Sequence, residues 1–134
     1  MYVLDTNVIS AVRRVDRAPQ VAAWLADKQE SELFLSVITV GEIERGISQQ
    51  RVRNPQFASD LQAWLDRTLT IFADRLLPFG AAEARIWGRL SQQIGHDGAD
   101  LMIAATALVC KATIVTGNAA DFAPTGVRLI DPFA

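Results

Sequence analysis

The sequence predicts an α/β protein, a three-layer α/β/α sandwich around a central, mainly parallel sheet of about five strands. Short apolar runs alternate along the chain with longer segments in which apolar residues recur at helical spacing. Strands that alternate with helices in this way pair in parallel, because each helix carries the chain back across the sheet. The length of 134 residues, without a linker-like tract, predicts a single domain over 1–134.

Each expected strand is a short apolar run bounded by polar or turn-forming residues. The first begins at Tyr2 and ends in the acid Asp5, and its aliphatic residues predict a buried place in the sheet. The other strands are expected at residues 33–37, 76–79, 112–116 and 127–130.

The expected helices are marked by capping residues and by apolar spacing. Thr6 is expected to cap a short first helix that begins at Asn7, because a hydroxyl can accept a bond from a backbone N–H of the first turn. The helix after the second strand is expected to start at Thr39, with Glu42 in its first turn. Further helices are expected from Pro19, at 54–69, at 80–95 and at 101–110.

The charge balance and the cysteine content restrict the classes of partner and compartment. Thirteen Lys and Arg against fifteen Asp and Glu give a formal net charge of -2, which argues against nucleic-acid binding through bulk positive charge. The single cysteine, Cys110, excludes an internal disulfide. No signal peptide and no run of roughly 20 apolar residues is visible, so we expect a cytoplasmic protein without membrane contact.

Four acids are expected to meet at one rim of the sheet. In a parallel sheet, the carboxyl ends of the strands and the starts of the helices that follow lie on the same edge. Asp5 ends the first strand, and Glu42 lies at the start of the helix after the second. Asp100 starts the apolar helix at 101–110, and Asp121 lies in the loop after the fourth strand. The neutral groups expected at this rim are Asn7, Thr116 and Asn118.

Each acid taken alone also has a purely structural explanation. Thr39 and Glu42 match a capping box, and other polar residues could cap a helix or hold a turn, namely Asp97, Asp100, Asn118 and Asp121. Caps do not explain four carboxylates on one edge, because like charges raise each other's pKa and destabilise a fold. A divalent cation would remove this repulsion, and carboxylate oxygens favour Mg²⁺ or Mn²⁺.

The chemistry that remains is metal-assisted hydrolysis of a phosphodiester. His96 is the only histidine, and we expect it to be a surface or capping residue, so histidine-based catalysis has little to work with. The sequence contains no glycine-rich phosphate-binding loop, which argues against nucleotide binding by that route.

Four segments keep a characteristic order and spacing: LDTNVIS from Leu4, TVGEIERGI from Thr39, DLMIAATAL from Asp100, and TGN from Thr116 followed by DF. Together they resemble the PIN-domain ribonucleases, specifically the VapC-type toxins of bacterial toxin–antitoxin pairs. The resemblance covers essentially the whole chain. It implies that the catalytic, metal-binding acids are Asp5, Glu42, Asp100 and Asp121, with Thr6, Asn7, Thr116 and Asn118 as supporting groups.

The resemblance also implies a mechanism and partners. One or two Mg²⁺ or Mn²⁺ ions would activate water for in-line attack on RNA, leaving a 5′-phosphate and a 3′-hydroxyl. An antitoxin would cover the acidic rim, and the apolar stripe from Phe57 to Leu69 together with Trp87 predicts a homodimer. The candidate RNA contacts are Arg13, Arg14 and Arg45.

Some assignments stay open at this point. Gly117 stands where related sequences often carry a basic or polar side chain, and Asp97 is an extra acid close to Asp100. The alternative functions are a Mg²⁺-dependent nuclease acting on DNA or on structured nucleic acid, and a PIN-fold binding module without catalysis. A receiver or haloacid-dehalogenase-like phosphotransfer domain would need a second acid beside Asp5 or a late lysine, and neither Lys28 nor Lys111 fits.

Overall fold

The computed structural model describes residues 1–134, with side chains for all of them except Val15. Within this described chain, five strands form one sheet in the order β3-β2-β1-β4-β5, with β1 (Tyr2–Leu4) at its centre. Each pairing in the sheet is parallel, which confirms the predicted architecture. The other strands are β2 (Leu33–Ser36), β3 (Leu76–Leu77), β4 (Thr113–Val115) and β5 (Arg128–Ile130).

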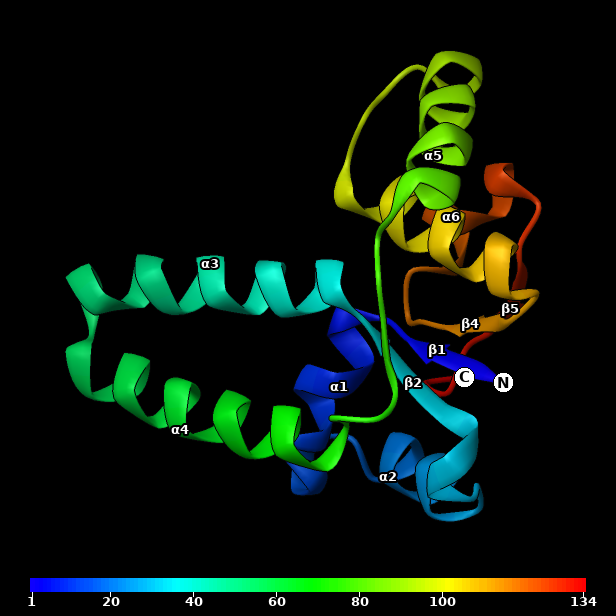
Figure 1. The fold of residues 1–134 in the computed structure, drawn as a ribbon. Coiled ribbons are helices and arrows are strands. Elements are labelled where there is room, and N and C mark those ends of the chain that lie inside the picture. The colour runs from blue at the N-terminus through cyan, green and yellow to red at the C-terminus, as the bar shows by residue number, and fades with distance from the viewer.

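Helices make the connections between the strands (Figure 1). The connection from β1 to β2 holds α1 (Thr6–Val12) and α2 (Pro19–Ala26). The connection from β2 to β3 holds α3 (Val37–Arg53) and α4 (Pro55–Ile71). The remaining helices are α5 (Ala81–Ile94), α6 (Ala99–Cys110) and the short α7 (Ala119–Phe122), which precedes β5.

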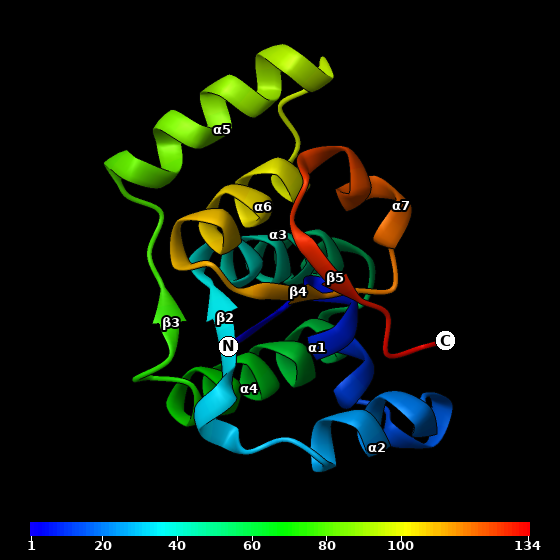
Figure 2. The same ribbon diagram turned by 90° about the vertical axis from the view of Figure 1, so that its right-hand side faces the viewer.

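The helices cover both faces of the sheet, as a three-layer sandwich requires. Figure 2 shows α5, α6 and α7 on one face, and α1, α2 and α4 on the other. Successive residues of a strand face opposite sides of the sheet. Val3 and Ile114 belong to the core beneath α6, whereas their neighbours Leu4 and Val115 belong to the core on the opposite face.

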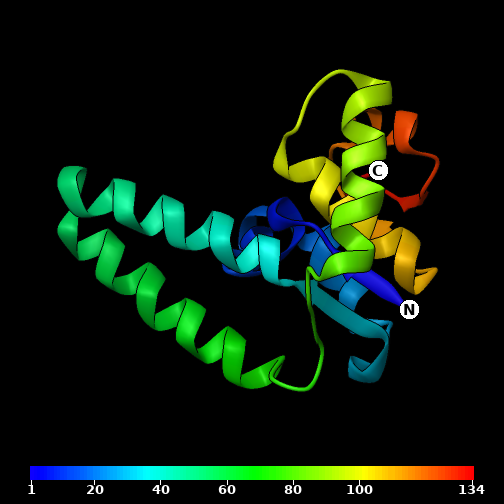
Figure 3. The same ribbon diagram turned by 45° about the horizontal axis from the view of Figure 1, so that its top comes forward.

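The helices α3 and α4 pack against each other as a hairpin that extends away from the sheet (Figures 1 and 3). The apolar stripe of α4 is used inside this chain: Ala58 and Leu65 are buried, and Leu61 and Trp64 pack against the same core cluster. Most of the stripe that we expected to support a homodimer is therefore used in the chain's own packing.

The start of α3 differs from the expectation. The helix begins at Val37, and Ser36 caps it, since the Ser36 hydroxyl accepts a hydrogen bond from the Ile38 N–H at 3.0 Å. Glu42 therefore lies in the second turn of α3. The cap is not Thr39, because β2 ends two residues earlier than a capping box at Thr39 would require.

The helix α6 is the buried helix that its composition predicts, with Leu101 and Ile103 fully inaccessible to solvent. It ends at Cys110, and the next residue, Lys111, has a φ of 56°, which places a non-glycine residue in the left-handed region. In the part of the chain that the structure describes, none of the helices combines the length and apolar character needed to span a bilayer.

Candidate metal-binding active site

Asp5 is the buried centre of the candidate site. It directly follows β1, its N–H donates to Val115 O of β4 at 2.9 Å, and only 4% of the residue is exposed. Asp5 Oδ1 accepts a hydrogen bond from the Thr6 N–H at 2.8 Å, so Asp5 is the N-cap of α1. Asp5 Oδ2 accepts one from the Thr116 hydroxyl at 2.8 Å. The expectation that Thr6 caps this helix is wrong, because α1 begins at Thr6 itself, directly after Asp5.

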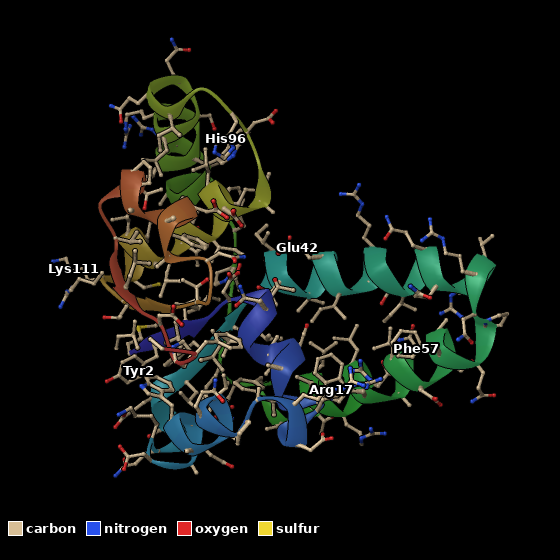
Figure 4. All side chains as sticks on the ribbon, turned by 180° about the vertical axis from the view of Figure 1, so that it is seen from behind. Tyr2, Arg17, Glu42, Phe57, His96 and Lys111 are labelled. Carbon is tan, nitrogen blue, oxygen red and sulfur yellow. The ribbon has the colours of Figure 1, made fainter. Side chains whose placement is uncertain are left out.

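Thr6 instead connects α1 to α3. Its hydroxyl donates to Glu42 Oε1 at 2.7 Å and lies 3.3 Å from the hydroxyl oxygen of Thr39, which is fully buried. Figure 4 shows Glu42 near the start of α3, where this helix meets α1. Thr39 was not among the expected site residues, because its place in the sequence suggested a helix cap.

Asp100 lies in the first turn of α6 and is partly buried. The N-cap of α6 is Gly98, so neither Asp97 nor Asp100 caps this helix. Asp97 is exposed. His96 is also exposed, as expected, and its Nδ1 accepts a hydrogen bond from the Gly98 N–H at 3.2 Å in the connection between α5 and α6 (Figure 4).

Asp121 approaches the rim from α7 and not from a loop. Phe122, the next residue, is fully buried and anchors this short helix to the core beneath α6. The Asp121 residue itself is exposed. Asn118, which precedes α7, is exposed as well.

The segment between β4 and α7 is tied to both Asp5 and α1. The Thr116 hydroxyl, which donates to Asp5, accepts a hydrogen bond from the Asn118 N–H at 2.9 Å. Asn7 Oδ1 accepts one from the Gly117 N–H at 3.2 Å. The polar groups expected at the rim therefore form a connected network around the buried carboxylate.

The pKa of Asp5 is raised above its ordinary value, and burial is the main cause. The hydrogen bonds from Thr116 and Thr6 oppose this rise because they favour the charged carboxylate. The charges of Glu42 and Asp121 raise the pKa further.

The pKa of Asp100 is raised as well, again mainly by burial. The charges of Asp5 and Asp121 add to the rise, and His96 opposes it. Asp5 is thus coupled to Glu42 of α3 and Asp121 of α7, and Asp100 of α6 is coupled to Asp5 and Asp121.

The donor chemistry of this group suits a hard divalent cation, because Mg²⁺ and Mn²⁺ prefer carboxylate oxygens. A cation would also relieve the mutual repulsion of the acids. Among the described side chains, no three or more acidic, histidine or cysteine groups are placed closely enough to hold a metal ion. The acids therefore suit a divalent cation by their chemistry and charge, although their side chains are not arranged around a preformed metal site.

The three arginines expected to contact RNA have different surroundings. The Arg13 guanidinium lies over the Phe57 ring, 5.1 Å from its centroid, and the residue is partly buried. Arg14 follows α1 and is exposed, and Arg45 is exposed on α3, three residues after Glu42.

Comparison with known proteins identifies related sequences and structures. The family model described as PIN domain matches residues 2–125. The VapC ribonuclease Y4jK from Sinorhizobium fredii is 32% identical over 99% of this chain and 98% of that protein. The toxin FitB from Neisseria gonorrhoeae is 32% identical over 99% of both chains. The crystal structure of FitAcB from Neisseria gonorrhoeae superposes with a TM-score of 0.85 at 33% identity, over 98% of both chains.

Proposed function

Since the chain belongs to the PIN domain family, we propose that it is a metal-dependent endoribonuclease and the toxin of a toxin–antitoxin pair. The observation that carries the proposal is the coupled group of four acids at the carboxyl edge of a parallel sheet. The relatives named ribonuclease and toxin each align with nearly the whole chain, which supports the substrate and the role.

In the proposed mechanism, Asp5, Glu42, Asp100 and Asp121 would hold Mg²⁺ or Mn²⁺. The ion would supply charge stabilisation for the phosphoryl oxygens and a lower pKa for the attacking water. The chain's own polar groups orient the ligands: Thr116 and the Thr6 N–H hold the Asp5 carboxylate, and the Thr6 hydroxyl holds Glu42. Hydrolysis by water needs no side chain as a covalent nucleophile.

The direct test is cleavage of defined RNAs by the wild-type chain and by Asp100→Asn, with Mg²⁺, with Mn²⁺ and with a chelator. The wild type should cleave only with a divalent ion. Asp100→Asn should lose more than about tenfold in rate, since even the groups that merely orient metal ligands are typically worth that much. Asp97→Asn is the matched control, because it removes an exposed acid only three residues away, and it should cleave like the wild type.

Each contrary outcome has a clear meaning. A wild type that cleaves no RNA with either ion would reject the proposal and leave a binding module without catalysis. Loss of cleavage in Asp97→Asn but not in Asp100→Asn would mean that the metal ligand is Asp97, about one helical turn earlier, and not Asp100. Single-stranded DNA of the same sequence serves as a second substrate, and faster cleavage of DNA would favour the alternative of a DNA nuclease.

A homodimer is part of the proposal, and its support comes from α5. Trp87 lies on this helix and remains partly exposed, so part of its ring surface is open to contact by a second copy. Light scattering at micromolar concentration tests the dimer, and a monomeric mass would reject it.

The other expected partner is a cognate antitoxin that covers the acidic rim. The relative named toxin FitB supports this role, because it aligns with 99% of this chain at 32% identity. The proposal includes a cytoplasmic location, where RNA is accessible, and a single working domain over 1–134. Suppression of RNA cleavage by the product of a small reading frame just upstream would support it, and an absence of inhibition by that product would contradict it.

A further inference from the structure

Beside the acidic rim, three helices enclose a hollow that the mechanism above does not use. It has a volume of about 270 Å³ and lies between α1, α3 and α4. Thr6 and Glu42, which are joined by a hydrogen bond of 2.7 Å, line it. The hollow is therefore continuous with the candidate active site.

Gly46 accounts for the open space. It lies inside α3 and lines the hollow, and a Cβ placed on it would meet no atom within 4 Å. Glycine inside a helix is less favourable than alanine by about 1 kcal/mol. No neighbouring atom requires a glycine at this position, so the effect of the missing side chain is to keep the hollow open.

The walls combine aromatic surface with cationic and amide groups. Phe57 and Trp64 of α4 line the hollow, and the Arg13 guanidinium lies over the Phe57 ring at 5.1 Å from its centroid. Figure 4 shows Phe57 on α4, in the hairpin that it forms with α3. Gln49 of α3 adds an amide that can both donate and accept hydrogen bonds. Aromatic rings, guanidinium groups and amides are the groups that bind unpaired nucleobases.

The size of the hollow limits what it can hold. From Glu42 to Gln49, α3 rises by roughly 10 Å. Small-molecule sites usually begin at roughly 300 Å³, so this hollow has room for one ring-sized group. Arg13 also places a positive charge beside an otherwise acidic rim, which a polyanion needs in order to approach.

We propose that this hollow binds one unpaired nucleobase of the RNA next to the scissile bond and thereby contributes to the choice of cleavage site. The inference rests on the proposed function, because it requires the acidic rim to cleave RNA. Trp64 provides the stacking surface together with the Phe57 ring, one face of which the Arg13 guanidinium covers. Gln49 contacts the base edge, and Arg13 contacts the adjacent phosphate.

The first experiment fills the hollow. Single-stranded RNAs of randomised sequence are cleaved by wild type, Gly46→Ala and Gly46→Leu, and the cut positions are sequenced. Gly46→Leu should reduce cleavage at the preferred sites by about tenfold, the size of effect expected when one stacked base is lost. Gly46→Ala should have a smaller effect. Gly41→Leu is the matched control, since Gly41 is also in α3 with no atom within 4 Å of a Cβ, yet lies outside the hollow.

The second experiment changes the recognition groups without filling the space. Gln49→Ala alters an exposed residue and should fold normally. If Gly46→Leu proves unstable in thermal melts, Gln49→Ala therefore still tests whether the hollow binds a base. It should weaken the preference for the base beside the cut while cleavage continues at other sites. Gln93→Ala, an exposed glutamine on α5, is its control and should cut like the wild type.

The outcomes separate this inference from the proposed function. The wild type alone tests whether the chain cleaves RNA. The ratio of each variant's cleavage rate to that of wild type tests whether the hollow contributes to the choice of cleavage site. If the wild type cleaves RNA while Gly46→Leu and Gln49→Ala cut the same positions at the same rate, the inference is overturned. It is also overturned if these variants keep the cleavage pattern and lose only inhibition by a protein partner, because the hollow would then be a protein-docking site.

Discussion

Asp5 is both the N-cap of α1 and a candidate metal ligand, and the two roles respond differently to substitution. Asparagine can accept the same capping bond without the charge. We expect Asp5→Asn to abolish metal-dependent cleavage and to leave the metal-free protein as stable as wild type or more stable, because repulsion from Glu42 and Asp121 disappears. Asp5→Ala also loses the cap and should be less stable than Asp5→Asn by about 1 kcal/mol. Thermal melts in chelator measure the stability of both variants. Equal losses of stability in Asp5→Asn and Asp5→Ala would contradict this division of roles.

Arg75 is a buried cation that joins three segments, and no pattern in the sequence singles it out. Only 9% of the residue is exposed, and its guanidinium lies over the Phe72 ring, 4.5 Å from the centroid. Nη1 donates to the carbonyls of Glu30 and Leu33, and Nη2 donates to that of Ile71. We expect Arg75→Met to lower the free energy of unfolding by about 2–3 kcal/mol, because three carbonyls lose a charged donor.

The control for Arg75 is its surface partner. Asp74 lies 3.4 Å from Arg75 Nε, but its side chain is 85% exposed. An exposed ion pair contributes about 0–1 kcal/mol, so Asp74→Ala should be close to wild type in urea unfolding. If Asp74→Ala were as unstable as Arg75→Met, the ion pair and not the carbonyl contacts would hold Arg75.

At the scale of elements, the segment between β4 and α7 is shaped by the ring of Phe133. A Cβ on Gly117 would lie 2.8 Å from Cδ2 and Cε2 of this ring, closer than a side chain can pack. This contact gives a physical reason for glycine at a position where related sequences often carry a basic or polar residue. We expect Gly117→Lys to lower the free energy of unfolding by about 1–3 kcal/mol, because the ring must be displaced.

A double-mutant cycle with Phe133→Ala measures that contact. Removal of the ring makes room for a side chain at 117, so Gly117→Lys should be milder in the Phe133→Ala background, with a coupling of about 0.5–3 kcal/mol. Strictly additive effects in denaturant unfolding would show that Phe133 does not select glycine at this position.

Local sequence patterns predicted the helices and strands themselves, but they did not predict several of the residues at which these elements begin or end. The spacing of apolar residues predicted α4, and glycines predicted both ends of α5, where Gly95 adopts a φ of 95°. The starts of α1 and α3 were misplaced because the cap depends on where the preceding strand stops, which apolar spacing does not define. The end of α6 at Cys110 was predicted correctly although Lys111, and not a glycine, occupies the left-handed position, whereas its start lies at Ala99, two residues before the expected one.

For the whole molecule, topology explains how acids far apart in sequence could be predicted as neighbours. A parallel sheet places every strand end on one edge, so the convergence of Asp5, Asp100 and Asp121 required only the order of elements. The side-chain bonds between helices were not predictable, because they depend on how the helices pack. Examples are the bond from Thr6 to Glu42 and the hollow beside Gly46. The same limit applies to the α4 stripe, whose packing partner proved to be α3.

The coupled acids also predict how stability depends on pH in the metal-free protein. The pKa values of Asp5 and Asp100 are raised on folding, so the folded chain binds more protons than the unfolded chain between the two sets of pKa values. Their contribution to stability is therefore fully present below the unfolded pKa and is lost as the pH rises through the folded pKa. Relative to an Asp5→Asn, Asp100→Asn double variant, wild type should lose stability from pH 4 to pH 7.

A divalent ion should reverse this loss, because it binds the ionised acids of the folded state and not the protonated ones. Binding to the folded state alone adds RT ln(1 + [L]/Kd), which is about 2.7 kcal/mol at a hundredfold excess over Kd. The rise in melting temperature caused by Mg²⁺ or Mn²⁺ should thus be larger at pH 7.5 than at pH 4.5, and should vanish in the double variant. Calorimetry at both pH values measures it. An equal rise at both values, or one that survives in the double variant, would place the ion away from the four acids.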